Sequence, residues 1–218
     1  MMQRLYAIAD ARVLARLGVA LEDFARELRA AGVGLVQYRD KTGSPQQVLR
    51  AAAVLRTMFA GTACRLIMND RADLAVLASF DGVHVGQGDL LPEDARRVVG
   101  AGRWVGVSTH TDEQVKAAGP ASQDRDVGHS AGAADYVACG PVFATGTKAD
   151  AEQVVGLEGV RRARTLTQKP LVAIGGITRA NARSVIDAGA DSVAVISGLF
   201  DQGETVEQVA RDFLELLG

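Results

Sequence analysis

Aromatic residues are scarce in this chain, and so is any excess of charge of one sign. Only 5% of the 218 residues are aromatic, and the formal net charge is −2. Proteins that bind nucleic acid or an anionic membrane usually present a basic surface, and the stacking of bases needs aromatic side chains. The composition therefore predicts no nucleic-acid partner and no membrane partner.

Long apolar runs are missing too. No stretch reaches the roughly 18 consecutive apolar residues of a spanning helix, and the N-terminus has no signal-peptide apolar region. We therefore expect a cytoplasmic protein. The two cysteines, Cys64 and Cys139, are spaced neither for zinc nor as a Cys-x-x-Cys pair, and we interpret them as reduced, mostly buried thiols.

Eight apolar, strand-like runs alternate with segments of helical periodicity. This alternation predicts a parallel sheet. An open doubly wound sheet usually carries a Gly-x-Gly-x-x-Gly fingerprint after its first strand, and this sequence has none. We therefore predict a single α/β domain over residues 1–218, folded as a (β/α)8 TIM barrel. The expected strands are residues 5–9, 33–38, 65–68, 82–85, 104–107, 136–139, 171–174 and 192–196, and the expected helices are residues 21–30, 45–59, 72–78, 92–99, 112–118, 157–166, 179–188 and 206–217.

One polar segment, residues 119–133, departs from this alternation. It is longer than the ~2–6 residues of an ordinary connection between a helix and a strand. Because it leads from the fifth helix into the sixth strand, we expect it on the bottom face, opposite the catalytic loops. On this interpretation His129 is a surface residue and not a ligand.

Seven of the strand-like runs end in short polar or glycine-containing patches. The carboxyl ends of parallel strands share one edge of a sheet, so these patches should meet at one mouth of the barrel. Cations, carboxylates and exposed backbone amides would then converge, which is the composition of a magnesium–phosphate site. The patches are residues 37–41, 69–70, 86–89, 108–110, 145–148, 175–176 and 197–198.

Asp70 and Asp89 follow the third and fourth strands and are the candidate ligands of Mg2+. Magnesium usually takes one or two carboxylates, and water and substrate phosphates complete its octahedron. Each aspartate alone could instead cap the helix that follows it. As a pair beside cationic patches, they favour metal binding.

Arg39, Lys41 and Lys148 are the candidate cations for a phosphate group. Arginine offers planar, bidentate donors to phosphate oxygens, and lysine offers a movable point charge. Residues 140–148 fail the spacing of a P-loop by one residue, and we interpret this long loop as a lid.

Glycines and a serine after the last two strands favour a phosphate site built from backbone amides. The loops after the seventh and eighth strands of such barrels commonly bind phosphate, and here they contain Gly175-Gly176 and Ser197-Gly198. Ser108 is expected to donate a hydrogen bond to a bound anion, because no acidic partner is spaced to identify a catalytic triad. His84 is expected to be a packed or wall residue, and His110 stays open as a minor site residue.

Taken together, these stretches resemble the thiamine-phosphate synthase family along the whole chain. The resemblance implies a TIM-barrel transferase that couples 4-amino-5-hydroxymethyl-2-methylpyrimidine diphosphate with 4-methyl-5-(2-phosphooxyethyl)thiazole. The expected products are thiamine phosphate and diphosphate, formed by a dissociative, magnesium-assisted substitution. The matching stretches are residues 5–10, 36–41, 68–74, 81–89, 106–110, 134–136, 140–148, 173–177 and 193–197.

The resemblance also implies a role for each matched residue. Asp70 and Asp89 would bind Mg2+, and Lys148, Arg39 and Ser108 would be the catalytic residues around the departing diphosphate. The residues implied for substrate binding are Gln37, Arg39, Lys41 and Asn69 on the pyrimidine diphosphate, Ser108 and Lys148 on the diphosphate, and Thr145, Thr147, Gly176, Ile196 and Ser197 on the thiazole phosphate.

Two other functions stay open at the level of sequence. A thiazole tautomerase-like paralogue would bind the thiazole phosphate but would not need the diphosphate and magnesium residues. A non-catalytic phosphate-binding barrel would need neither a complete set of cations nor the two aspartates. The sequence also leaves open whether the chain forms a homo-oligomer.

Overall fold

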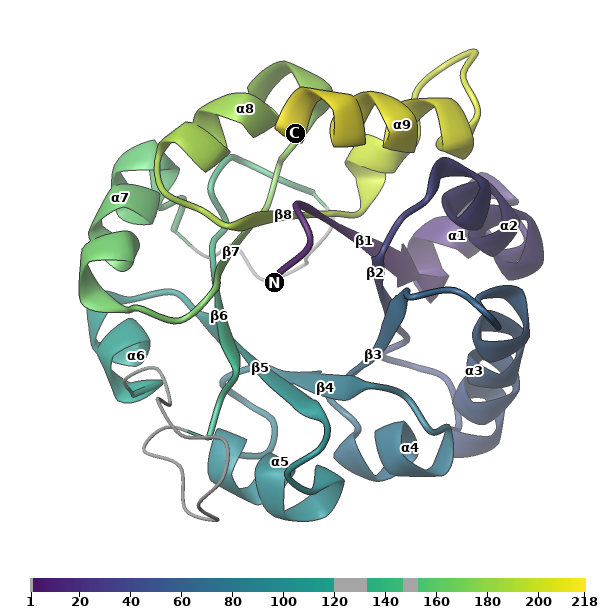
Figure 1. Ribbon diagram of the computed structural model, residues 1–218, viewed down its shortest axis with the longest axis horizontal. Helices are drawn as coiled ribbons and strands as arrows, with labels where there is room; N and C mark the ends of the chain where they lie inside the picture. Colours follow the sequence, from purple (N-terminus) through teal and green to yellow (C-terminus); the bar gives the residue numbers. More distant parts are fainter. Residues whose placement is uncertain (1, 120–132, 147–152) are drawn as a thin grey trace.

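The computed structural model describes residues 2–119, 133–146 and 153–218. Eight parallel strands pair in chain order, and β8 pairs back with β1 to close a barrel (Figure 1). The predicted (β/α)8 fold is therefore confirmed. The strands are β1 (Leu5–Asp10), β2 (Leu35–Arg39), β3 (Arg65–Asn69), β4 (Gly82–Val85), β5 (Trp104–Thr109), β6 (Tyr136–Cys139), β7 (Leu171–Ile174) and β8 (Ser192–Val195).

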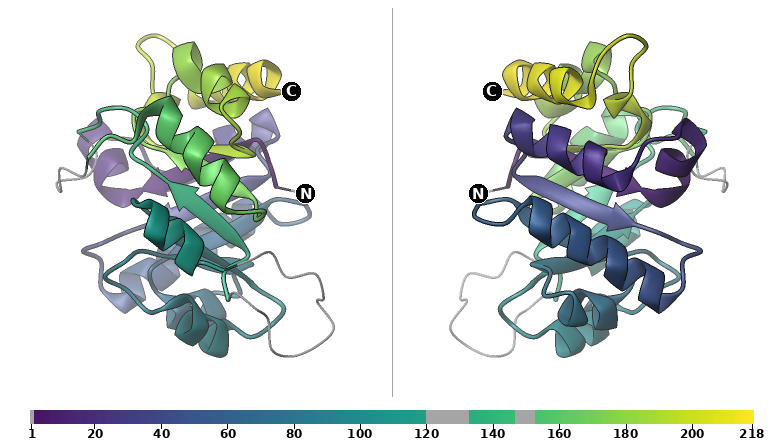
Figure 2. Two further views of the ribbon diagram at one scale, coloured as in Figure 1. Left: turned by 90° about the vertical axis from the view of Figure 1, so that its left-hand side faces the viewer. Right: turned by 90° about the vertical axis from the view of Figure 1, so that its right-hand side faces the viewer.

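Helices surround the barrel on the outside, and the views from the side show them inclined along the strands (Figures 1 and 2). None of the helices in the described part of the chain is long and apolar enough to cross a membrane. The helices that the sequence predicts are α2 (Leu21–Ala31), α3 (Pro45–Met58), α4 (Ala72–Leu77), α5 (Pro92–Val99), α6 (Asp112–Ala117), α7 (Gly156–Leu166), α8 (Arg179–Asp187) and α9 (Val206–Leu217).

Two short elements are additions to the predicted pattern: α1 (Ala11–Leu17) and the 3-10 turn η1 (Ser197–Leu199). Asp10 begins α1, because its side chain accepts a hydrogen bond from the backbone N–H of Val13. Gly18 ends the helix in a left-handed conformation with φ 66°. The sequence analysis did not predict α1, which directly follows the strand that Asp10 ends.

Capping boxes start several of the outer helices. The side chains of Ser44 and Thr178 each accept the backbone N–H of the third helical residue. The side chain of that residue in turn accepts the backbone N–H of the capping residue. Both helices begin at the residues predicted from the sequence, Pro45 and Arg179. The helix α5 also begins at its predicted residue, Pro92, but no side chain caps it.

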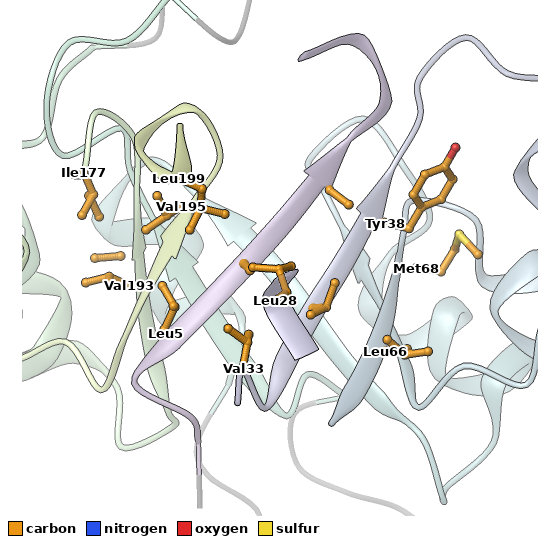
Figure 3. Packing of buried hydrophobic residues seen from close by; sticks show 14 of the residues in the cluster. Leu5, Leu28, Val33, Tyr38, Leu66, Met68, Ile177, Val193, Val195 and Leu199 are labelled. Carbon is orange, nitrogen blue, oxygen red and sulfur yellow. The ribbon is translucent and has the colours of Figure 1, made fainter. Parts of the chain in front are cut away.

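The apolar core has two layers, one on each side of the sheet. The inner layer fills the barrel and contains Tyr6, Ile67 and Tyr136. The outer layer lies between the sheet and the helices, and Figure 3 shows part of it around β1, β2 and β8. Successive residues of a strand point to opposite faces, so each strand contributes to both layers. The residues labelled in this outer layer are Leu5, Leu28, Val33, Tyr38, Leu66, Met68, Ile177, Val193, Val195 and Leu199.

Aspartates brace the N-terminal end of the barrel at three strand entrances. Asp81, Asp135 and Asp191 precede β4, β6 and β8. The carboxylate of each accepts the backbone N–H of a residue in the preceding strand, at 2.8, 2.7 and 2.8 Å respectively. The backbone N–H of each aspartate bonds back to the carbonyl of that same residue. This end of the barrel is therefore stabilised by repeated rings of two hydrogen bonds, away from the predicted site.

Both cysteines are free thiols, with Cys139 buried and Cys64 half-buried. Burial raises the pKa of each thiol to about 12, as expected for inert cysteines. Most of the long polar segment that the sequence places on the bottom face, including His129, falls in residues 120–132, outside the described residues.

Candidate active site

A cavity opens inside the barrel at the carboxyl ends of the strands. Its empty volume is ≈ 410 Å³, including the open mouth. All eight strands contribute to its wall, which mixes apolar side chains with a few polar ones, as small-molecule sites do. Four predicted substrate-binding residues of β2, β3 and β5 lie in this wall, together with Ile196 after β8. The lining residues are Tyr6, Ile8, Gln37, Arg39, Asn69, His84, Ser108, Ala138, Val172, Ile174, Ala194 and Ile196.

A chain of hydrogen bonds crosses the cavity from β2 to β5. Gln37 Nε2 donates to the Tyr6 hydroxyl at 2.8 Å, which lies 3.0 Å from the Tyr136 hydroxyl. The Tyr136 oxygen lies 3.0 Å from His84 Nδ1, and His84 Nε2 lies 2.9 Å from Ser108 Oγ. Burial raises the pKa of both tyrosines far above neutrality, so both hydroxyls stay protonated. This polar relay fixes the orientation of two predicted site residues, Gln37 and Ser108.

Asn69 contributes a buried donor to the same cavity. Its Nδ2 atom has no hydrogen-bond partner within the described residues. A buried polar group without a partner is destabilising, and such groups are rare in folded proteins. An acceptor atom on a bound molecule would supply the missing partner.

Lys41, Asp70 and Asp89 form a compact cluster of charge at the mouth. Lys41 Nζ lies 2.5 Å from Asp70 Oδ2. Asp70 and Asp89 are close enough for each to shift the pKa of the other. Asp89 Oδ2 accepts the backbone N–H of Gly86 at 2.8 Å. The structure therefore brings together the two aspartates that the sequence predicts to be neighbours.

Neither aspartate caps a helix. The residue that precedes α4 is Arg71, and no side chain caps this helix. Asp70 adopts a left-handed backbone with φ 61°, which is uncommon for a residue other than glycine. Its N–H donates to the carbonyl of His84 at 2.7 Å, which ties the end of β3 to β4.

The pKa values of the two carboxyls move in opposite directions. Burial raises the pKa of Asp70, and the neighbouring Asp89 raises it further, while Lys41 partly offsets the shift. For Asp89, burial also raises the pKa, but Asp70, the Gly86 N–H and Lys41 together outweigh it and lower the pKa. Two neighbouring carboxyls of this kind are stabilised by a shared proton or by a cation.

The donor set at the mouth fits magnesium. The Lys41 ammonium already acts as a cation beside the carboxylate pair, and Mg2+ prefers carboxylate oxygens. The described residues contain no group of three or more His, Cys, Asp or Glu that could hold a metal ion. The protein would therefore supply two carboxylates, and the remaining ligands would be water and the phosphates of a substrate.

Arg39 reaches the cavity from the end of β2 and forms an ion pair with Asp10 at the end of β1. Asp10 is almost fully buried, with 2% of its side chain exposed. Sequence reasoning missed this residue as part of the site. The signal for it was an acidic residue directly after the first strand, on the same alternate face as Tyr6 and Ile8.

The loops after β6, β7 and β8 pack against one another at the mouth. Gly176 has φ 65°, and a Cβ atom there would lie 2.7 Å from Cβ of Phe143 and from the carbonyl of Ala144. A Cβ atom at Gly198 would lie 2.4 Å from the carbonyl of Ile177. These glycines therefore allow the three backbones to approach closely.

The predicted residues for the thiazole phosphate lie on these loops where the structure describes them. Thr145 is half-buried in the loop after β6, Gly176 follows β7, and exposed Ser197 opens η1 after Ile196. Thr147 and Lys148 lie outside the described residues. His110, after β5, contacts the loop after β6, since its Nδ1 atom lies 2.7 Å from the carbonyl of Gly140.

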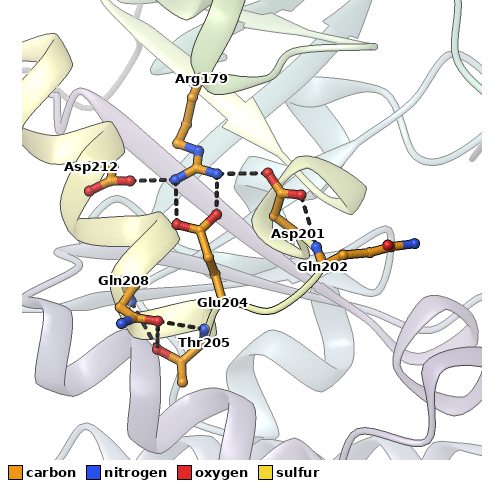
Figure 4. A network of polar contacts seen from close by, with 7 residues as sticks. All are labelled: Arg179, Asp201, Gln202, Glu204, Thr205, Gln208 and Asp212. Carbon is orange, nitrogen blue, oxygen red and sulfur yellow. Dashed lines mark hydrogen bonds and ion pairs between the residues drawn. The ribbon is translucent and has the colours of Figure 1, made fainter.

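A cluster of ion pairs fastens the segment after η1 (Figure 4). Arg179, at the start of α8, contacts Asp201, Glu204 and Asp212. Glu204, followed by Asp212 and Asp201, raises the pKa of Arg179, and Arg179 in turn lowers the pKa of Asp201. The cluster links α8, α9 and the loop between η1 and α9, which supports the turn that carries Ser197.

Comparisons with known proteins agree with this geometry. The family model described as "Thiamine monophosphate synthase" matches residues 5–199. A thiamine-phosphate synthase of Koribacter versatilis is 50% identical over 216 residues, covering 98% of this chain and 95% of that protein. One from Methanoregula boonei is 39% identical over 97% of this chain and 91% of that protein.

A solved structure shows the same relationship. The thiamine phosphate pyrophosphorylase of Pyrococcus furiosus superposes with a TM-score of 0.80 at 29% identity, covering 98% of this chain and 95% of that chain. The resemblance noted in the sequence is thus confirmed over nearly the whole length. The chain is a transferase of the thiamine-phosphate synthase type, and it belongs to the thiamine monophosphate synthase family.

Proposed function

We propose that this chain couples 4-amino-5-hydroxymethyl-2-methylpyrimidine diphosphate with 4-methyl-5-(2-phosphooxyethyl)thiazole to give thiamine phosphate and diphosphate. The observation that carries the proposal is the cluster of Lys41, Asp70 and Asp89 at the mouth of the cavity. It pairs a phosphate-binding cation with a carboxylate pair suited to magnesium, beside a cavity lined by all eight strands.

The pyrimidine diphosphate would occupy the cavity with its diphosphate toward the mouth. The apolar wall of Ile8, Ala138 and Val172 suits the face of an aromatic ring. Asn69 would donate its buried N–H to the substrate, and Gln37 is held by the polar relay for the same purpose. Arg39 and Lys41 would bind the diphosphate oxygens.

Asp70 and Asp89 would hold Mg2+ at the mouth. When bound, the ion would neutralise negative charge on the diphosphate. With Mg2+ as the partner of Asp70, the ammonium group of Lys41 would be available to the substrate. The negative charge of the diphosphate would offset the added positive charge of the ion.

The proposed chemistry is a dissociative substitution. The bond between the pyrimidinylmethyl carbon and the diphosphate oxygen breaks, and its electron pair leaves with the diphosphate. The amino group of the pyrimidine stabilises the resulting cation, and the thiazole nitrogen donates its lone pair to form the new C–N bond. No nucleophilic side chain is needed, so the protein acts by positioning and by stabilising developing charge.

The remaining predicted residues would complete the site. Ser108, which accepts or donates a bond with His84, would contact the diphosphate, and Lys148 would ease its departure. Thr145 and Thr147 would bind the thiazole phosphate together with the backbone at Gly176, Ile196 and Ser197. The close packing of the three loops supports this placement, since the loops after the seventh and eighth strands of such barrels commonly bind phosphate.

The test is to incubate the purified chain with both heterocycles and Mg2+ and to assay for thiamine phosphate and released diphosphate. We expect both products in equal amounts, and neither when one heterocycle is left out or when Mg2+ is chelated. Asp70→Asn should remove the magnesium-dependent turnover without preventing folding. Absence of both products with the intact chain would refute the proposal.

The same assay separates the two alternatives. A thiazole tautomerase would convert a thiazole substrate without any pyrimidine diphosphate. A non-catalytic barrel would bind the phosphorylated heterocycles, which calorimetry detects, and would release no diphosphate.

A further inference from the structure

Asp10 lies beside Arg39 at the carboxyl ends of β1 and β2. The two residues are register partners on β1 and β2, and Arg39 Nη1 contacts Asp10 Oδ2. Arg39 lines the cavity and is 17% exposed, whereas Asp10 is 2% exposed. The carboxylate is therefore buried and bound to a guanidinium group that lines the cavity.

The second oxygen of Asp10 is fixed as well. Oδ1 accepts the backbone N–H of Val13 at 2.9 Å and so caps α1. Rotating the carboxylate away from Arg39 would break this cap. Asp10 is thus fixed between the strand β1, which it ends, and the helix α1, which its side chain caps.

We infer that Asp10 is a positioning residue that orients the guanidinium group of Arg39 toward the diphosphate, an inference that rests on the proposed function. An arginine side chain has several rotatable bonds, and one buried anchor fixes the plane of its remaining donors. Such preorganisation matters because bidentate contacts to phosphate depend on the orientation of the donor plane.

Two effects of Asp10 on an anion oppose each other. Its negative charge partly offsets the attraction of Arg39 for diphosphate, while its fixed position orients the donors. If the offset dominated, removing the charge would tighten the binding of diphosphate. If orientation dominates, removing the anchor weakens the binding of diphosphate. We expect this result, because a guanidinium group near the mouth can rotate into solvent once its carboxylate partner is removed.

Asp10→Asn separates the anchor from the cap. The single carbonyl oxygen of asparagine can still accept the Val13 N–H, and asparagine is a good helix cap. Its amide nitrogen then faces Arg39, so that two donors oppose each other. Asp10→Ser is the second variant, because serine keeps the cap but is too short to reach the guanidinium group.

Asp191→Asn is the matched control. Asp191 also binds an arginine and a backbone N–H, since Oδ2 lies 2.8 Å from Arg164 Nη1 and 2.8 Å from the Leu171 N–H. It precedes β8 and therefore lies at the opposite end of the barrel from Asp10, which ends β1. A general loss of stability should appear in this variant too, but an effect on diphosphate should not.

The experiment measures the binding of inorganic pyrophosphate with Mg2+ by calorimetry, and then kcat and KM. We expect both Asp10 variants to bind pyrophosphate about 10-fold more weakly and to lose about 10- to 100-fold in kcat, which is the range for a misplaced group at a reacting centre. In both Asp10 variants, the KM for the thiazole phosphate should stay within about twofold of wild type. In Asp191→Asn, the pyrophosphate affinity, kcat and KM should all stay within about twofold of wild type.

A double-mutant cycle with Arg39→Gln decides whether Asp10 acts through Arg39. If it does, Asp10→Asn has no further effect on pyrophosphate binding once Arg39 is replaced. An equal loss in both backgrounds, or binding in Asp10→Asn that is unchanged or tighter, would overturn the inference, as would a wild-type chain that does not bind pyrophosphate. If the wild type binds pyrophosphate but forms no thiamine phosphate, the proposed function fails while the role of Asp10 at the anion site is still decided.

Discussion

Lys41 Nζ lies 2.5 Å from Asp70 Oδ2 at the mouth of the barrel. The carboxylate proposed to bind magnesium therefore has a cation beside it before any metal arrives. Lys41 is 48% exposed and Asp70 is 17% exposed, so this ion pair is partly solvated. Pairs of this kind contribute only ~0–1 kcal/mol, which is small enough for a divalent ion to displace the ammonium group.

Lys41→Gln should therefore strengthen the binding of Mg2+ to the free protein. It removes a competitor and a like charge, and because the pair is weak we expect the gain to be no more than about fivefold. The same variant should raise the KM for the pyrimidine diphosphate, because the proposed phosphate contact is lost. Calorimetry with Mg2+ and steady-state kinetics measure the two effects, with Lys116→Gln on exposed α6 as the control. Weaker Mg2+ binding in Lys41→Gln would contradict this competition.

The raised pKa of Asp70 gives a second prediction, which concerns the dependence of stability on pH. Burial, together with Asp89, raises this pKa above the ordinary value of 3.8. In the metal-free protein the folded state therefore holds this proton more tightly than the unfolded chain does. By linkage, its contribution to stability is present at low pH and is lost as the pH rises above 3.8 through the raised folded value.

Asp70→Asn removes this titration. In metal-free buffer, the free energy of unfolding of Asp70→Asn should increase relative to that of wild type as the pH rises through that window. With excess Mg2+, wild type should be the more stable of the two. In wild type the pKa of Asp89 is lowered, so its own window lies below 3.8. Denaturant unfolding at several pH values tests this. A constant difference between the two proteins across the window would contradict it.

The barrel was predictable because its signals are repeated along the chain. Each strand carries an apolar run, and each predicted outer helix carries an apolar stripe. An error in the bounds of a single element therefore does not change the predicted fold. The charged residues of the mouth were predictable for a related reason. Strand ends fix where Lys41, Asp70 and Asp89 must lie, and the structure places them in one cluster.

The interior of the barrel was less predictable. Tyr6 and Tyr136 are counted as apolar in a strand pattern, and nothing in the sequence shows that their hydroxyls meet. Asp10 and Arg179 act through partners that are distant in sequence, Arg39 and the acidic residues around η1. Contacts between elements depend on register and packing, which single-strand patterns do not contain.

Tyr136→Phe should disconnect the polar relay. Removal of this hydroxyl leaves Tyr6 and His84 without one partner each, and an unsatisfied buried group costs about 1–3 kcal/mol. Denaturant unfolding should show a loss in this range. Because His84 also orients Ser108, kcat should fall more than the KM for the thiazole phosphate changes. Phe24→Tyr, which alters a buried ring in the outer core, offers a comparison for stability loss alone. Equal kinetic effects in both variants would contradict the role of the relay.

Gly176→Ala tests the packing of the three loops at the mouth. The new Cβ atom would lie 2.7 Å from Phe143 Cβ and from the Ala144 carbonyl, so the loop that carries Thr145 must shift. Gly18→Ala is a closely matched control, because Gly18 has φ 66° against 65° for Gly176 but has nothing within 4 Å of its Cβ position. The left-handed backbone alone should cost each variant about 1–2 kcal/mol. Gly176→Ala should lose ~1–3 kcal/mol more from overpacking, and its KM for the thiazole phosphate should rise. Equal unfolding free energies for the two variants, with an unchanged KM, would show that these loops do not form the phosphate site.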